Sequence, residues 1–223
     1  MTEALGACPP TEPPDQEAIF RRIAEALTRD GYALVPDAID LNLLQALRAR
    51  IEHLGADDFV PAGIGRAQEQ MKNEFVRRDE IHWLERSDPT EAQWLAWVDA
   101  LRDYLNRRLF LGLFSYEAHF AHYAPGAFYK RHVDAFRGEA NRILSTVLYL
   151  NEGWQHADGG QLVLYPEVGL EPLAKVDPVM GTLAVFLSEE FPHEVLPAAR
   201  HRFSIAGWCR VNTSTAERVD PPR

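Results

Sequence analysis

The sequence predicts an α+β protein that is mainly β: a double-sheet jelly roll supported by helices on its N-terminal side. Before residue 113, apolar residues recur at helical spacing in three stretches. After it, short runs rich in Val, Leu, Phe and Tyr alternate with Gly, Pro, Asn and Asp. About eight short strands joined by turns favour a jelly roll over a parallel sheet.

The helical support is expected over residues 15–112. Its three apolar stretches have capping residues at their boundaries, which is typical of helices. The expected helices begin at Asp15, at Asp40 and at Ser87 or Asp88, and they end near Gly31, Gly55 and Leu109. A short strand is expected over 32–35, and residues 57–80 predict either a loop or a strand pair.

The β part is expected over residues 113–211, where apolar runs stand between turn residues. The expected strands lie near 115–123, 128–134, 143–151, 161–165, 171–176, 182–187, 193–196 and 201–210. The sequence therefore predicts one domain over residues 15–223, preceded by a flexible leader over 1–14 that is rich in proline.

The composition narrows the choice of partners. The formal net charge is −10, and an acidic chain repels phosphate backbones, so no nucleic-acid partner is expected. No apolar run approaches the roughly 20 residues of a membrane helix. The N-terminus lacks the basic and apolar segments of a secretion signal, and Cys8 and Cys209 show no zinc-binding spacing. A cytoplasmic protein without a membrane partner is expected.

One group of side chains points to a metal ion. His132 and Asp134 lie two residues apart at the end of an expected strand, where such side chains share a face. His193 begins a later expected strand. Two His and one Asp leave up to three positions of an ion open, as in non-haem iron(II) oxygenases, whereas structural zinc usually takes four protein ligands.

The His-x-Asp pattern alone is a weak signal, because His156 and Asp158 repeat it. That second pair lies in a Gly-rich turn, and a flexible turn holds ligands poorly. We expect it to be a solvated turn. Taken alone, His132 and Asp134 would also fit a surface pair at a strand end.

A basic residue strengthens the case for the first pair. Arg202 follows His193 by nine residues, on an expected strand where it shares a face with Ser204, Ala206 and Trp208. A buried guanidinium needs a partner, and its fork suits a carboxylate. An oxoacid that chelates the ion at one end would offer a free carboxylate at about this distance. The alternative is an ordinary ion pair with an internal Asp or Glu.

Five segments, taken in order, resemble one enzyme family. They lie between about Tyr123 and Arg210 and read Tyr-Ala-Pro-Gly-Ala-Phe-Tyr-Lys-Arg-His-Val-Asp, Leu-Tyr-Leu-Asn-Glu-Gly-Trp, Asp-Gly-Gly-Gln-Leu-Val-Leu-Tyr-Pro-Glu, Pro-His-Glu-Val and Arg-Phe-Ser-Ile-Ala-Gly-Trp. Together they resemble the 2-oxoglutarate- and iron(II)-dependent prolyl hydroxylases, in particular the oxygen-sensing animal branch and its bacterial relatives.

The resemblance implies roles by position. His132, Asp134 and His193 match the iron ligands. The residues that match the binders of the distal 2-oxoglutarate carboxylate are Arg202 and Tyr149. Those that match the lining of the cofactor and substrate pocket are Tyr123, Tyr129, Leu162 and Trp208, and those at its entrance are Asp79 and Trp83. Ala206 departs from the pattern, because the animal enzymes carry a Thr there.

The resemblance also implies a double-stranded β-helix of the jelly-roll kind and an activity. Iron(II), 2-oxoglutarate and O2 are the implied cofactor and co-substrates, with ascorbate as a further candidate. The implied dioxygenase reaction hydroxylates a prolyl residue of a partner protein or peptide and converts 2-oxoglutarate to succinate and CO2. In the bacterial branch, a translation elongation factor is the expected kind of target.

Three other functions stay open at this point. The same chemistry could act on a free amino acid or small metabolite, although an expected flexible loop over 66–83 favours a peptide. Nucleobase demethylation is disfavoured by the acidic charge and by Trp208, which stands where such enzymes carry a second Arg. A non-enzymatic β-sandwich that binds a sugar or an ion would require the metal-type group to be a coincidence.

Overall fold

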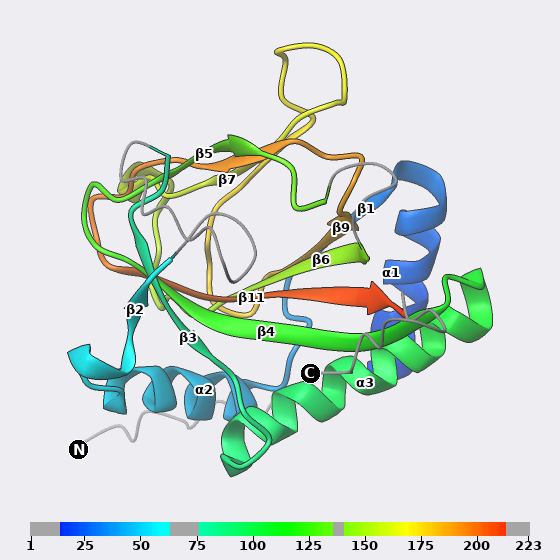
Figure 1. Ribbon diagram of the computed structural model, residues 1–223, viewed down its shortest axis with the longest axis horizontal. Helices are drawn as coiled ribbons and strands as arrows, with labels where there is room; N and C mark the ends of the chain where they lie inside the picture. Colours follow the sequence, from blue (N-terminus) through cyan, green and yellow to red (C-terminus); the bar gives the residue numbers. More distant parts are fainter. Residues whose placement is uncertain (1–13, 63–75, 136–140, 213–223) are drawn as a thin grey trace, which may run out of the picture.

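The computed structural model describes residues 14–62, 76–135 and 141–212, and in these ranges two antiparallel sheets face each other (Figure 1). The large sheet has the strand order β1-β9-β6-β11-β4-β3-β2, and the small sheet has the order β5-β10-β7-β8. The strands are β1 (Tyr32–Val35), β2 (Val60–Pro61), β3 (Asp79–Trp83), β4 (Leu113–Tyr123), β5 (Tyr129–His132), β6 (Arg142–Tyr149), β7 (Leu162–Leu164), β8 (Ala174–Val176), β9 (Leu183–Leu187), β10 (His193–Val195) and β11 (Arg202–Val211). This arrangement confirms the predicted jelly-roll class.

All eight strands expected after residue 113 are present, with shifted ends. The shift that matters most is at β5, which was expected to continue to Asp134 but ends at His132. Asp134 therefore lies in a bend beyond the strand. The predicted leader lies outside the described residues except for Pro14.

The segment over 57–80 forms a strand pair in the part that the structure describes. Val60 and Pro61 of β2 pair with Ile81 and Glu80 of β3, and β3 in turn pairs with β4 along its whole length. The prediction of a flexible loop over 66–83 is therefore wrong for 79–83. Alternate residues of β3 are buried, which anchors it in the large sheet. Residues 63–75 lie outside the described ranges.

The three helices begin where the sequence predicts. They are α1 (Gln16–Asp30), α2 (Leu41–His53) and α3 (Pro89–Leu109), with two short 3-10 turns, η1 (Ala56–Asp58) and η2 (His156–Asp158), elsewhere in the described chain. Asp15, Asp40 and Asp88 each accept hydrogen bonds from backbone N–H groups of the first turn, so Asp88 rather than Ser87 is the third cap. Gly31 ends α1 with a φ of 76°, a conformation that glycine adopts without strain.

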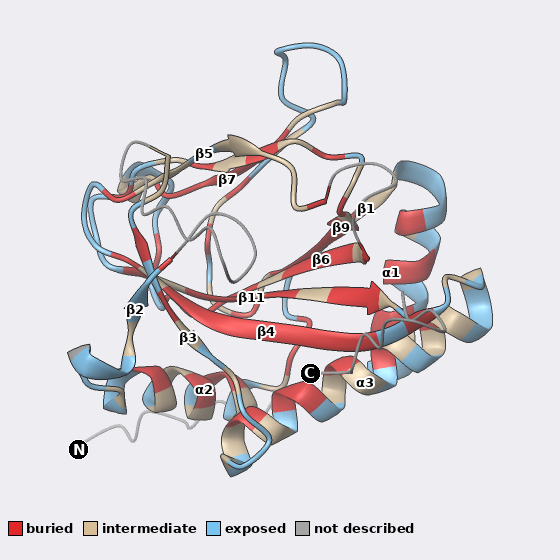
Figure 2. Ribbon diagram, viewed as in Figure 1, coloured by how far each residue is buried: buried red, intermediate tan, exposed pale blue. Residues whose placement is uncertain are grey.

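The helices cover the outer face of the large sheet (Figures 1 and 2). Their buried faces and that side of the sheet form one hydrophobic cluster, which includes Ile23, Leu47, Trp94, Phe120 and Ile205. Burying this much apolar surface is the main force that holds the helices to the sheet. The opposite face of the large sheet is left to line the space between the two sheets. Within the described ranges, no helix combines the length and apolarity needed to cross a membrane.

Candidate metal centre

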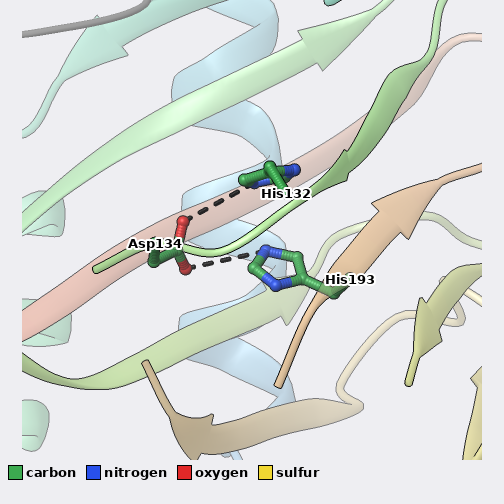
Figure 3. Close-up of side chains that lie close together, drawn as sticks. All are labelled: His132, Asp134 and His193. Carbon is green, nitrogen blue, oxygen red and sulfur yellow. Dashed lines mark ion pairs between the residues drawn. The ribbon is translucent and has the colours of Figure 1, made fainter. Parts of the chain in front are cut away.

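Three side chains from two segments that are remote in sequence meet between the sheets (Figure 3). One ligand atom from each of His132, Asp134 and His193 lies within 4.8 Å of the others. Nε2 of His132 is 3.6 Å from one carboxylate oxygen of Asp134, and Nε2 of His193 is 3.6 Å from the other. The register of the small sheet explains the meeting, because His132 and His193 are direct cross-strand partners on β5 and β10.

Backbone carbonyls orient both imidazoles. Nδ1 of His132 lies 2.8 Å from the carbonyl oxygen of Lys130, and Nδ1 of His193 lies 3.0 Å from that of Phe191. When Nδ1–H donates to these carbonyls, each Nε2 keeps its lone pair and faces the carboxylate. Two imidazole nitrogens and one carboxylate oxygen suit a divalent transition-metal ion and leave further coordination positions open.

The charge states of the ligands favour metal binding at neutral pH. Burial lowers the pKa of His193 to about 4, so its imidazole is neutral. Burial acts to raise the pKa of Asp134, but His193, His132 and the Ser145 hydroxyl outweigh it and hold that pKa well below its usual range. His193 therefore presents a neutral imidazole and Asp134 a carboxylate, the protonation states that metal ligands require.

Asp134 lies next to the two imidazoles, but strand alternation is not what places it there. Asp134 lies beyond the end of β5, so it does not share a strand face with His132. A hydrogen bond from the Ser145 hydroxyl on β6 holds its carboxylate, at 2.6 Å. Ser145 received no role in the sequence analysis, because a lone serine on a strand carries no signal.

A stack of two side chains packs against the ring of His132. The ring of Tyr129 lies 3.5 Å from that of His132 at an angle of 16°, and the guanidinium of Arg77 lies 4.3 Å from the centre of the Tyr129 ring. Arg77 donates to both carboxylate oxygens of Asp79, at 2.7 and 2.5 Å. Asp79 is buried, so this expected entrance residue instead anchors Arg77. Arg77 was not among the residues expected at the site.

The second expected subsite, around Arg202, is suited to binding a carboxylate. Arg202 is 1% exposed, and its guanidinium lies 4.9 Å from the Tyr123 ring and 5.1 Å from the Tyr149 ring. It donates to two neutral oxygens, the carbonyl of Gly160 at 2.9 Å and the hydroxyl of Ser204 at 3.3 Å. No Asp or Glu among the described residues forms an ion pair with it, so this part of the chain gives the alternative of an ordinary internal ion pair no support.

The environment of Tyr149, which lies next to Arg202, also indicates a carboxylate ligand. The Tyr149 hydroxyl is buried and has no hydrogen-bond partner among the described residues. A buried charge and a buried hydroxyl are both destabilising unless a polar group meets them. A ligand carboxylate would satisfy both, which fits the distal end of 2-oxoglutarate. Leu162 belongs to the same buried cluster as Tyr123 and Tyr149 and contributes apolar surface.

An aromatic row extends along the inner face of the large sheet. Trp83, which is 39% exposed, meets His119 edge-on at 5.2 Å, and His119 lies 5.4 Å from Trp208. Arg142 covers the Trp208 ring at 3.7 Å and pairs with Glu117 at 2.8 Å. Of these residues, only Trp83 and Trp208 were expected at the pocket.

The competing His-x-Asp pair takes no part in this centre. His156 and Asp158 lie in η2, where His156 meets Asp177 at 3.0 Å and Asp158 meets Arg200 at 3.0 Å. Both contacts are on the surface, as expected for a solvated turn.

Comparison with known proteins gives the class. Residues 118–210 match the 2OG-Fe(II) oxygenase superfamily. The solved structure of a Pseudomonas putida prolyl 4-hydroxylase is 42% identical and covers 86% of this chain and 98% of that chain, with a TM-score of 0.77. The chain therefore belongs to the 2OG-Fe(II) oxygenase superfamily, whose members use iron(II) and 2-oxoglutarate.

Within this superfamily, the most informative relatives are prolyl hydroxylases. A Caenorhabditis elegans hypoxia-inducible factor prolyl hydroxylase is 30% identical over 205 residues, or 85% of this chain. A solved Trichoplax adhaerens prolyl hydroxylase, in complex with a hypoxia-inducible factor peptide, covers 87% of this chain and 90% of its own with a TM-score of 0.77. At 24% identity it shows the fold alone. The chain spans 28–57% of the length of the curated relatives that it matches.

Proposed function

We propose that the protein hydroxylates a prolyl residue in a partner protein or peptide and converts 2-oxoglutarate to succinate and CO2. One oxygen atom of O2 enters the prolyl C–H bond and the other enters succinate. The observation that carries this proposal is the combination of two sites in one domain: a His/Asp/His group and a buried Arg202 with no acidic partner among the described residues.

The metal ligands and the residues around Arg202 would serve different parts of the reaction. When bound, iron(II) supplies the activation of O2 that C–H hydroxylation needs. His132, Asp134 and His193 would hold the ion. Arg202 and Tyr149 would orient 2-oxoglutarate through its distal carboxylate, and their burial keeps bulk water away from the reacting groups.

The aromatic row supports a prolyl substrate. Trp83 and Trp208 offer aromatic surface on the inner face of the sheet, with the buried His119 packed between them, and a proline ring packs well against such surfaces. The partial exposure of Trp83 suits a substrate that extends beyond one residue. A translation elongation factor is the kind of partner we propose, and a cytoplasmic location stays a prediction.

The test compares substrates of increasing size. Purified protein receives iron(II), 2-oxoglutarate and air with free proline, with proline-containing peptides or with an intact elongation factor. We expect succinate formation that rises with the peptide or protein, together with the mass gain of one oxygen atom on a proline. Asp134→Ala is the matched control without turnover. Turnover of free proline alone would favour the small-metabolite alternative, and no turnover of any substrate would refute the proposal.

A further inference from the structure

We propose that Ser145 and Ser188 form a two-hydroxyl relay that positions the metal ligand Asp134, and that this relay is needed for full metal affinity. The inference rests on the proposed metal site, and it assigns a role to two residues that no sequence motif marks. Both serines belong to the large sheet or its immediate continuation, whereas the imidazole ligands belong to the small sheet.

Asp134 needs support from outside its own strand. It lies in the bend after β5, where no strand pairing of its own fixes the backbone. Among the described residues, the Asp134 carboxylate lies 3.6 Å from each of the two imidazoles and accepts one hydrogen bond, from the Ser145 hydroxyl. A carboxylate held only by the ion that it binds would lose rotational freedom on binding, which weakens affinity.

The direction of the hydrogen bonds follows from counting protons. Ser145 has one hydroxyl proton and donates it to Oδ2 of Asp134 at 2.6 Å. Its oxygen lies 2.9 Å from the Ser188 hydroxyl. Because the Ser145 proton is already used, Ser188 must donate to Ser145. The order is therefore Ser188 to Ser145 to carboxylate, and hydrogen bonds in such a chain strengthen one another.

The serines themselves are rigidly held. Ser145 is 1% exposed and Ser188 is fully buried. Ser145 lies on β6 opposite Phe186 of β9 and Trp208 of β11. The backbone N–H of Ser188 donates to the carbonyl of Ile143 at 2.9 Å, which ties it to the same strand. The relay therefore links the bend that carries Asp134 to the middle of the large sheet.

The relay also affects which carboxylate oxygen of Asp134 is free to bind the metal ion. Ser145 occupies one lone pair of Oδ2, the oxygen on the His193 side, and leaves Oδ1 without a hydrogen bond from it. We infer that the hydroxyl biases Asp134 toward binding through one oxygen. Such binding leaves more open positions on the ion than a carboxylate that binds through both oxygens.

The test measures metal binding without requiring any substrate. Mn(II), which tolerates air, is titrated into metal-free wild type, Ser145→Ala, Ser145→Thr and Ser188→Ala, and free Mn(II) is followed by electron paramagnetic resonance. Loss of a supporting hydrogen bond typically lowers metal affinity about 10- to 100-fold. We expect a loss of that size for Ser145→Ala, a loss of about threefold to tenfold for Ser188→Ala, and rescue by Ser145→Thr, which keeps the hydroxyl.

The matched control is Thr146→Val on the neighbouring position of β6. The Thr146 hydroxyl is also buried and bonds to the Tyr116 hydroxyl at 2.8 Å, but it faces the helices. This variant should lose thermal stability and keep wild-type Mn(II) affinity. If Ser145→Ala does not fold, Ser145→Cys and Ser188→Ala carry the test.

Wild-type affinity in Ser145→Ala would overturn the relay while leaving the metal site intact. Equal losses in Ser145→Ala and Ser145→Thr would overturn it too, because the hydroxyl would then be irrelevant. No Mn(II) binding by the wild-type protein would overturn the metal site and the relay together. Wild-type Mn(II) binding without turnover of any prolyl substrate would instead point to failure of the proposed function alone.

Discussion

Replacing Tyr149 by Phe should stabilise the ligand-free protein and weaken 2-oxoglutarate binding. The Tyr149 side chain is fully buried, and its hydroxyl has no hydrogen-bond partner among the described residues. Removing an unsatisfied buried hydroxyl relieves a desolvation penalty of about 1–3 kcal/mol without opening a large cavity. The free energy of unfolding should therefore rise by about 1 kcal/mol, and Tm by about 2–4 °C.

The same change has the opposite effect on the co-substrate. Burial raises the pKa of Tyr149 to about 12, against the effect of Arg202, so the hydroxyl is a proton donor at neutral pH. A hydrogen bond from it to a carboxylate contributes about 1.5–3 kcal/mol. Without it, 2-oxoglutarate should bind roughly 10- to 100-fold more weakly.

The assay combines two measurements on each protein. Urea unfolding without metal or 2-oxoglutarate gives the free energy of unfolding, and calorimetric titration of the Mn(II)-loaded protein gives the affinity for 2-oxoglutarate. Tyr116→Phe is the matched control, because the Tyr116 hydroxyl is also buried but is bonded to Thr146. It should lose about 1 kcal/mol of stability and keep its affinity. Destabilisation by Tyr149→Phe, or an unchanged affinity for 2-oxoglutarate, would refute the reasoning.

Variants of Asp134, Arg202 and His119 probe the metal ligand, the carboxylate binder and a buried imidazole. Asp134→Ala should fold but lose turnover and lose the stabilisation that a bound metal ion gives. In the wild type, that stabilisation is about 2.7 kcal/mol when the metal concentration is a hundred times Kd. Thermal unfolding with and without Mn(II) measures it. Arg202→Lys should weaken 2-oxoglutarate about 10- to 100-fold, because an ammonium cannot replace the planar fork; calorimetry that finds equal affinity would contradict it. Burial lowers the pKa of His119 to about 4 from an ordinary value of about 6.5, so the unfolded state binds its proton first as the pH falls. The contribution of neutral His119 to the free energy of unfolding is therefore complete above about pH 6.5 and is lost towards pH 4. Replacing His119 by Phe should reduce the loss of that free energy between pH 7 and pH 5 by about 2 kcal/mol, as measured by urea unfolding.

The helices show how far local sequence patterns reach. Asp15 and Asp40 cap α1 and α2 as predicted, because a cap depends on a side chain and the two or three backbone N–H groups that follow it. The choice between Ser87 and Asp88 needed the structure, since both residues are competent caps. The prediction of a flexible loop failed at β3, because β3 is a strand through its pairing with β4, which lies some 40 residues further along the chain.

The sequence by itself determined which residue types were available for chemistry. It contained two imidazoles, a carboxylate and a guanidinium in ordered segments, and strand alternation placed Arg202, Ser204 and Trp208 on one face. These properties are local, because they depend on neighbours within a few positions. They were enough to predict a jelly roll and a candidate metal site.

Only the tertiary structure decided that these groups meet and what surrounds them. The register between β5 and β10 puts His132 beside His193, and β6 brings Ser145 to Asp134. The lack of an acidic partner for Arg202 in the described chain is likewise a property of the packed interior. The physical reason is that contacts between remote strands are set by the packing of the whole core, and no short pattern along the chain encodes them.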